Sequence, residues 1–317
     1  MHYQIKPPLE GVGGGQRFQS KPFTHSAIQQ FTHLKVRNLL TLIRFPNLLI
    51  IVLTQVLVQA CLLFPELPVF EALHYRFWLL TLSTVFIAAA GYIINDYYDI
   101  KIDAINKPGR VIIGKDLSRR KAMLGHLFLS GVGVGIGFLL SVKVGLVNAG
   151  AVMLLWGYSA DLKKRPFWGN LTIAVLAATM VLVVSVLANL DNLGVWAYAA
   201  FAFVSTLIRE IIKDLEDMKG DAMHDCKTLP IVLGVAKTRP IVYAFLILFY
   251  ALVLAATFYR QNNTFFGVYL GLAVLAPGLS IGWRLRRADR KRHFAGLSAF
   301  CKFMMLTGTL SMLFFRL

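Results

Sequence analysis

The chain has 317 residues, of which 57% are hydrophobic and only 15% are charged, and its mean hydropathy is +0.63. This composition excludes an ordinary soluble globular protein and favours a protein embedded in lipid. The formal net charge of +17 does not indicate a nucleic-acid partner, because the loops between apolar segments account for it, as described below.

Apolar runs close to 20 residues long recur along the chain, and each can cross about 30 Å of hydrocarbon. Before them, residues 1–36 are polar, and we expect a flexible cytoplasmic tail that is separate from a domain at residues 37–317. Nine spans are expected, at residues 47–64, 77–94, 122–142, 144–159, 170–188, 195–212, 240–258, 266–283 and 294–315. The predicted fold is therefore all-α, a polytopic bundle of nine transmembrane helices.

Three features inside the spans predict how the helices pack. The third span carries glycines at every second position from Gly131 to Gly137, which indicates close approach of a neighbouring helix. His126 and Lys302 lie inside the third and ninth spans. Because ionisable groups are costly in lipid, we expect both side chains to face the protein interior, with the alternative for Lys302 that its ammonium group extends along the span toward the membrane interface.

Lysine and arginine are distributed unequally between the two ends of the spans. The tail and the loops after spans two, four, six and eight together hold 28 of the 33 basic residues, whereas the alternate loops hold four. Basic residues concentrate on the cytoplasmic side of membrane proteins. We therefore expect a multi-pass protein of the cell's inner or plasma membrane, with its amino terminus and these loops in the cytoplasm.

Two acidic motifs follow the second and sixth spans, on that same cytoplasmic side. Their members are Asn95, Asp96, Asp99 and Asp103 in the first motif, and Asp214, Asp217 and Asp221 in the second. The aspartates of each motif are spaced i, i+3, i+7, so on a helix they share a face within roughly 60°. Solvated interface residues would explain one such aspartate but not two identical triplets. Clustered carboxylates need a cation between them, and Mg²⁺ binds both carboxylate and phosphate oxygens, so the motifs predict a metal-bridged phosphate or diphosphate site.

The two motifs resemble those of the UbiA superfamily of intramembrane prenyltransferases. Residues 95–103 match the family pattern NDxxDxxxD, residues 214–221 match its second aspartate motif, and the resemblance covers about residues 35–317. Within the superfamily, residues 99–108 resemble the branch that contains digeranylgeranylglyceryl phosphate synthases, chlorophyll synthases and homogentisate prenyltransferases. Residues 209–221 are most similar to the enzymes that act on glycerophosphate lipids.

This resemblance implies a Mg²⁺-dependent transferase that moves a prenyl group, here geranylgeranyl, from a prenyl diphosphate donor to a prenylated glycerol phosphate, forming an ether lipid in the membrane. The alternative is an aromatic acceptor of quinone biosynthesis, namely a hydroxybenzoate, homogentisate or naphthoate. It stays open because residues 110–115 depart from the RPIPSG of many relatives. An ion-coupled transporter is a third hypothesis, but transport favours acids near the midplane, whereas these gather beside basic loops.

The resemblance also implies a role for individual residues. The expected metal ligands, direct or through water, are Asp96, Asp99, Asp103, Asp214, Asp217 and Asp221, with Asp99 and Asp217 at the catalytic centre. The expected diphosphate contacts are Asn95, Arg110, Lys163 and Lys213. Cations of this kind hold phosphate oxygens. Aromatic faces can stabilise an allylic carbocation, and the aromatic residues expected in the substrate cavity are Tyr92, Tyr98 and Tyr158.

Overall fold

The structure of the protein is a computed structural model that describes residues 36–106, 109, 111–259 and 263–316. The chain divides into two units, residues 1–37 and 38–317, and the description below concerns the second. Residues 1–35 of the predicted tail and the predicted diphosphate contact Arg110 lie outside the described residues.

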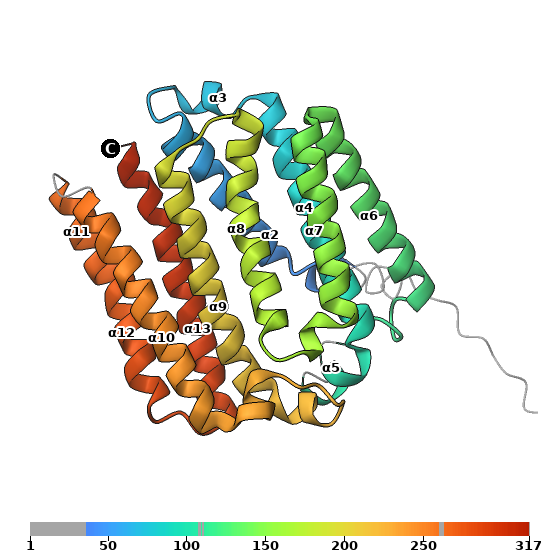
Figure 1. Cartoon of the computed structure of the whole chain (residues 1–317). Coiled ribbons are helices and arrows are strands. Elements are labelled where there is room, and N and C mark those ends of the chain that lie inside the picture. The colour runs from blue at the N-terminus through green and yellow to red at the C-terminus, as the bar shows by residue number, and fades with distance from the viewer. Residues whose placement is uncertain (1–35, 107–108, 110, 260–262, 317) are drawn as a thin grey trace, which may run out of the picture. The chain divides into compact units, whose positions relative to one another are not determined.

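In the described part of the chain, nine helical segments are long and apolar enough to cross a membrane, which confirms the predicted all-α bundle (Figure 1). Six spans are single helices, namely α4 (Tyr75–Tyr98), α6 (Arg119–Leu140), α7 (Val142–Ala160), α8 (Trp168–Ala188), α9 (Leu193–Ala222) and α10 (Leu229–Tyr259). Two spans contain a π-helical turn: α2 (Phe45–Leu57) is extended by one to Leu63, and α11 (Thr264–Leu270) is joined by one to α12 (Ala276–Leu285). The last span is α13 (Lys291–Leu310), which a 3₁₀ turn extends to Phe315. Two short helices, α3 (Val69–Ala72) and α5 (Ile100–Asn106), lie at opposite ends of the bundle.

Polar residues at helix starts explain where several spans begin. The Ser141 hydroxyl accepts a hydrogen bond from the Val144 backbone N–H at 3.1 Å, and Asn192 Oδ1 accepts one from Val195 at 3.2 Å. Such caps satisfy backbone N–H groups that have no partner within the helix. Helix α10 begins earlier than the predicted seventh span, at Leu229, but its first residues form a separate helical segment that ends at a kink at Gly234. The φ of 78° at this kink is one that glycine adopts without steric penalty.

The close packing predicted for the third span occurs at two of its four glycines. A Cβ at Gly137 would lie 2.6 Å from Nδ2 of Asn148, so α7 approaches α6 closely there. Asn148 Nδ2 donates to the Ser83 hydroxyl at 2.6 Å, which in turn donates to the carbonyl of Gly133 at 2.7 Å. This buried chain of hydrogen bonds ties α4, α6 and α7 together, whereas the other two glycines face open space.

The two ionisable residues inside the spans differ in their surroundings. His126 is buried, as predicted, and its Nδ1 lies 3.0 Å from the carbonyl of Ala90 on α4. Lys302 is exposed on α13, so of the two positions expected for it the structure shows the exposed one and not the interior one. The long apolar stem of lysine lets its ammonium group extend toward the membrane interface, so an interior position is not required.

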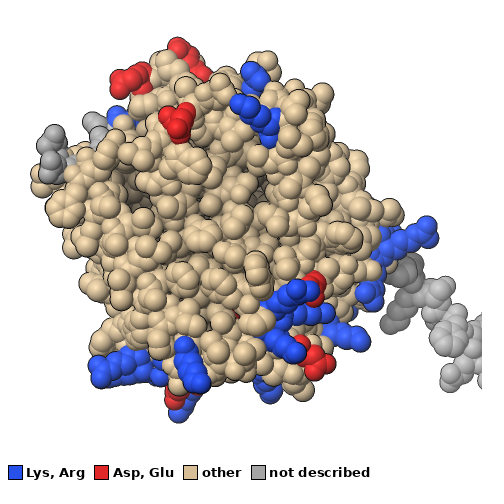
Figure 2. All heavy atoms as spheres, viewed as in Figure 1, with Lys and Arg blue, Asp and Glu red and all other residues tan. Residues whose placement is uncertain are grey.

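Charged residues and helix lengths mark the end of the bundle where the acidic motifs lie. Figure 2 shows a wide uncharged belt, with lysine and arginine gathered along the edge below it. The 30 residues of α9 span about 45 Å, more than the hydrocarbon thickness of about 30 Å. The C-terminal part of α9 carries the second motif and packs against α5, so both motifs meet at the lower end of the bundle in Figure 1.

Candidate active site between α4 and α9

The first acidic motif crosses a break between two helices. Helix α4 ends at Tyr98, Asp99 has φ −89° and ψ 4°, and α5 begins at Ile100. The turn is held by hydrogen bonds, since the Asp99 N–H donates to the Asn95 carbonyl at 3.0 Å and the Asp103 N–H donates to the Asp99 carbonyl at 2.8 Å. The prediction of one continuous helical face is therefore wrong here, because the altered backbone at Asp99 changes the rotation of the residues after it.

The second acidic motif lies on an unbroken helix, as predicted. Asp214, Asp217 and Asp221 all lie on α9 and line one pocket, whereas Glu216 does not line it. Asp217 is only 9% exposed. Asn170, at the start of α8, donates from Nδ2 to Asp214 Oδ2 at 2.8 Å. The regular 100° rotation per residue of this helix therefore presents the three aspartates together.

The two motifs meet around a small polar pocket of about 80 Å³, which is room for a few water molecules or ions. Its lining residues are Arg44, Asn95, Asp99, Ile102, Asp103, Tyr158, Lys163, Lys213, Asp214, Asp217, Asp221, Cys226 and Thr228. Nine of the residues predicted from the sequence are among them. Of the remaining predicted residues, Asp96, Tyr92 and Tyr98 do not line the pocket.

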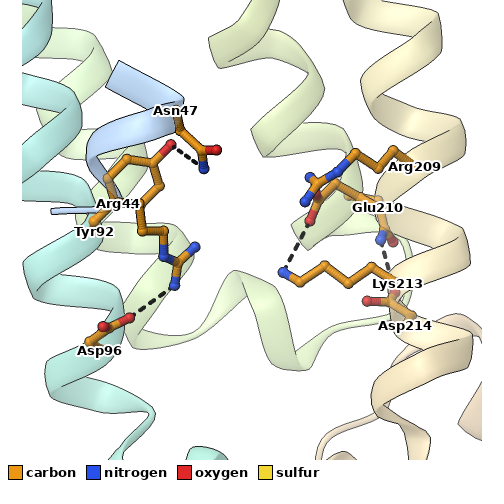
Figure 3. Close-up of polar contacts among 9 residues, drawn as sticks. Arg44, Asn47, Tyr92, Asp96, Arg209, Glu210, Lys213 and Asp214 are labelled. Carbon is orange, nitrogen blue, oxygen red and sulfur yellow. Dashed lines mark hydrogen bonds and ion pairs between the residues drawn. The ribbon is translucent and has the colours of Figure 1, made fainter. Parts of the chain in front are cut away.

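Ion pairs cross and flank this pocket. The Lys163 ammonium group donates to Asp99 Oδ1, and both side chains are largely buried. Glu210 pairs with Arg209 and, at 3.6 Å, with Lys213 on the α9 side. Figure 3 shows these α9 residues on the opposite side of the view from Arg44 and Asp96. The site therefore combines five carboxylates with three cations, which suits a highly charged anion accompanied by metal ions.

Arg44 enters the site from the start of α2. Its guanidinium donates to Asp96 Oδ1 at 2.9 Å and lies 4.8 Å from the centre of the Tyr92 ring. Burial opposes the charge of this guanidinium, but the Asp96 carboxylate, together with Tyr92 and Tyr158, outweighs that effect and raises the pKa of Arg44. Arg44 is therefore a permanent cation in the site, and Asp96 is engaged with it beside the pocket.

The three predicted aromatic residues lie in different surroundings. Tyr158, at the end of α7, lines the pocket. The Tyr92 hydroxyl accepts a hydrogen bond from Asn47 Nδ2 at 3.3 Å and so supports the wall next to Arg44. Tyr98 is 40% exposed and contacts the edge of Tyr97. Of these three residues, only Tyr158 lies close enough to the acidic residues to contact a carbon that reacts beside them.

The donor set of the pocket fits Mg²⁺. Asp99, Asp103, Asp214, Asp217 and Asp221 offer carboxylate oxygens around one space, and hard divalent cations take such ligands. Within the described residues, however, no three His, Cys, Asp or Glu side chains are gathered closely enough to hold a metal as they stand. The assignment of Mg²⁺ to this pocket thus rests on the chemistry of the lining residues. The ion pair between Lys163 and Asp99 would have to break before all five carboxylates could bind a metal.

Several residues of the site were not predicted from the sequence. Arg44 lies 51 residues before the first motif, and in the sequence it looks like any other basic residue at the end of a span. Asn170 gives no signal, because a single asparagine at a helix start is common. Cys226 and Thr228 follow α9 in a turn that returns to the pocket. Burial raises the pKa of the Cys226 thiol, and the Asp221 carboxylate adds to this rise, so the thiol is protonated at neutral pH.

Fold and site together define a membrane-embedded enzyme with acidic motifs on two facing helices. Residues 51–307 match the model of the UbiA prenyltransferase family, and the chain belongs to this family. The resemblance predicted from the motifs is confirmed, and so is the class of enzyme: the protein is a prenyltransferase, not a transporter.

Several relatives within the family carry the same name, digeranylgeranylglyceryl phosphate synthase. The relative from Methanosphaera stadtmanae is 38% identical over 193 residues, which are 61% of this chain and 70% of the relative. The relative from Methanoregula boonei is 40% identical over 54% of this chain and 62% of its own length. The relative from Korarchaeum cryptofilum is 30% identical over 70% of this chain and 80% of its own length. These names agree with the branch that residues 209–221 predicted.

Solved structures share the fold. A digeranylgeranylglyceryl phosphate synthase superposes with a TM-score of 0.67 at 21% identity, covering 89% of this chain and 98% of the other. A UbiA homologue from Archaeoglobus fulgidus bound to GPP and Mg²⁺ superposes with a TM-score of 0.63 at 16% identity, covering 87% of this chain and 99% of the homologue. At these identities the likeness establishes the architecture of the bundle.

Proposed function

We propose that this protein transfers a geranylgeranyl group from geranylgeranyl diphosphate to geranylgeranylglyceryl phosphate in a Mg²⁺-dependent reaction that forms an ether lipid. The observation that carries the proposal is the single pocket lined by five aspartates from both motifs and by three cations. The shared name of the relatives supports the choice of acceptor. The homologue bound to GPP and Mg²⁺ supports a prenyl diphosphate donor and the metal.

In this proposal, each wall of the pocket has its own task. When bound, Mg²⁺ neutralises the charge that develops on the diphosphate leaving group. Asp99 and Asp103 would hold it from the first motif, and Asp214, Asp217 and Asp221 would hold it from the second. Lys163 moves from Asp99 to the diphosphate oxygens as the ligand enters, and Lys213 contacts them from α9. Asn95 orients a ligand or a water molecule. Arg110 lies outside the described residues, and its predicted contact with the diphosphate stays a prediction.

The reaction breaks one bond and forms another. The bond between the allylic carbon and the diphosphate oxygen breaks, and the diphosphate leaves with the electron pair. The acceptor hydroxyl oxygen then attacks the allylic carbon, and its proton passes to the released diphosphate, giving the ether and hydrogen diphosphate. The face of Tyr158 stabilises the positive carbon.

The acceptor carries a phosphate of its own, so a glycerophosphate needs cationic contacts beyond those that hold the diphosphate. Arg44 meets this need, because it lines the pocket from α2, opposite the α9 residues that carry Lys213 (Figure 3). A hydroxybenzoate, homogentisate or naphthoate also carries a carboxylate or hydroxyl but lacks the phosphate. The position of Arg44, apart from Lys213 on α9, therefore supports the phosphorylated acceptor.

Purified protein with geranylgeranyl diphosphate, Mg²⁺ and competing acceptors is expected to form the digeranylgeranyl ether lipid, because both phosphate groups find cations in the pocket. Mass spectrometry of the products checks this result. Transfer to an aromatic acceptor, with none to geranylgeranylglyceryl phosphate, would establish the alternative acceptor and leave the prenyl transfer intact.

We further propose that the site opens to the cytoplasm, because 28 of the 33 basic residues belong to the tail and to the loops on the side of the acidic motifs. Single cysteines introduced near residues 112 and 288 are expected to resist a membrane-impermeant thiol reagent in intact cells and to react after the cells are opened. Labelling of the protein that carries only its native cysteines, all of which are buried, gives the background signal. Labelling from outside at either position would reverse the orientation.

A further inference from the structure

One short segment of the chain reaches both acidic motifs. Residues 162–170, here termed the corner, connect α7 to α8 through a 3₁₀ turn at Leu162–Lys164 and include the first three residues of α8. From its beginning, Lys163 donates to Asp99 of the first motif. From its end, Asn170 donates to Asp214 of the second motif at 2.8 Å. The corner thus contacts both walls of the pocket through two different kinds of group.

Three contacts hold the corner in place. A Cβ on Gly169 would lie 2.8 Å from the Cα of Lys163, so the two ends of the corner are packed backbone against backbone. Phe167 has φ 71°, in the left-handed region that non-glycine residues rarely adopt, and its ring stacks on Phe245 with centroids 6.2 Å apart. The Lys227 N–H, from the loop after α9, donates to the Lys164 carbonyl at 2.8 Å.

Asn170 is the member of the corner whose chemistry the proposed reaction leaves unexplained. Its side chain is 5% exposed, and a buried amide is unfavourable unless it is hydrogen-bonded. The Asn170 side-chain amide donates a hydrogen bond to one carboxylate oxygen of Asp214, Oδ2. Since an N–H donor on one carboxylate oxygen fixes the rotation of the whole group, Oδ1 of Asp214 acquires a defined direction.

We propose that Asn170 is a positioning residue that holds Asp214 in the rotamer in which it ligates the metal. The inference rests on the proposed function, because it concerns how the proposed metal ligand is oriented. The corner carries Lys163 as well, and the close packing at Gly169 sets the separation between the two groups. Asp99 and Asp214 are therefore aligned by the same nine residues, although their motifs lie more than 100 residues apart in the sequence.

Mn²⁺ binding tests this inference without relying on turnover. Purified protein is titrated with Mn²⁺ in the presence of inorganic diphosphate, and free Mn²⁺ is followed by electron paramagnetic resonance. Asn170→Leu keeps the approximate size of the side chain and removes the donor, and Asn170→Ala removes both. We expect each variant to bind Mn²⁺ about tenfold or more weakly, as for the loss of other groups that orient a metal ligand. In turnover, half-saturating Mg²⁺ rises by a similar factor, and kcat at saturating Mg²⁺ changes much less.

Thr172→Val is the matched control. Thr172 is also buried at the start of α8, but its hydroxyl donates to the Trp168 carbonyl within the same helix. This variant is expected to bind Mn²⁺ as the unaltered protein does, and thermal unfolding checks that all the variants are folded. Unchanged Mn²⁺ affinity in both Asn170 variants would overturn the positioning role alone, as would a loss of kcat that saturating Mg²⁺ leaves in place. An unaltered protein that binds no Mn²⁺ would overturn the metal site itself.

Discussion

Asp217→Asn is expected to reduce turnover by about two orders of magnitude or more, because it replaces a proposed metal ligand by a neutral amide of nearly the same size. Asp217 lies at the middle of the second motif, is almost completely buried and lines the pocket. An amide oxygen binds Mg²⁺ more weakly than a carboxylate and leaves the charge of the diphosphate uncompensated. Initial rates with geranylgeranyl diphosphate at several Mg²⁺ concentrations measure the effect.

The neighbouring residue supplies the control for this variant. Glu216 lies about 160° around the helix from Asp214 and does not line the pocket. Glu216→Gln is therefore expected to change turnover by no more than about twofold. Equal damage from Glu216→Gln and Asp217→Asn would contradict the assignment of one catalytic face to α9, even with the enzyme class intact. Mild effects of both variants would mean that these acids are merely solvated.

Removal of divalent cations is expected to abolish turnover completely. Five carboxylates line a pocket that has three cations, and a diphosphate adds further negative charge that the cations alone do not balance. EDTA treatment followed by exchange into metal-free buffer should leave no measurable product, and Mg²⁺ should restore the rate. EDTA that has been saturated with Mg²⁺ beforehand is the control for effects of the chelator other than metal removal. Full turnover in excess free chelator would contradict the metal-dependent mechanism.

The architecture was largely predictable because hydrophobic length is a strong signal in membrane proteins. Runs of about 20 apolar residues each became a span, and the nine predicted spans agree with the nine in the described part of the chain. The signal was weaker where a helix leaves the hydrocarbon. The residues before Pro240 read as a loop, yet α10 begins at Leu229 and turns at Gly234, because hydropathy does not report helices outside the apolar region.

The site was predictable to the extent that its residues repeat in a pattern. Asp214, Asp217 and Asp221 are spaced for one helical face, and the helix is indeed continuous there. The same spacing in the first motif conceals the break at Asp99, since a change of backbone angle at one residue leaves no mark on spacing. Contacts from elsewhere in the chain, such as those of Arg44 and Asn170, are properties of tertiary packing and have no sequence pattern.

The length of α9 has a consequence for how a lipid reaction can proceed at all. The helix is about 45 Å long, about 15 Å more than a hydrocarbon layer of about 30 Å, and the three aspartates lie in its C-terminal turns. A prenyl diphosphate bound as proposed keeps its charged end in the aqueous headgroup zone, and its tail stays dissolved among the helices. Neither the donor nor the product then has to move a phosphate group across the hydrocarbon layer, so both can enter and leave by lateral diffusion within one leaflet.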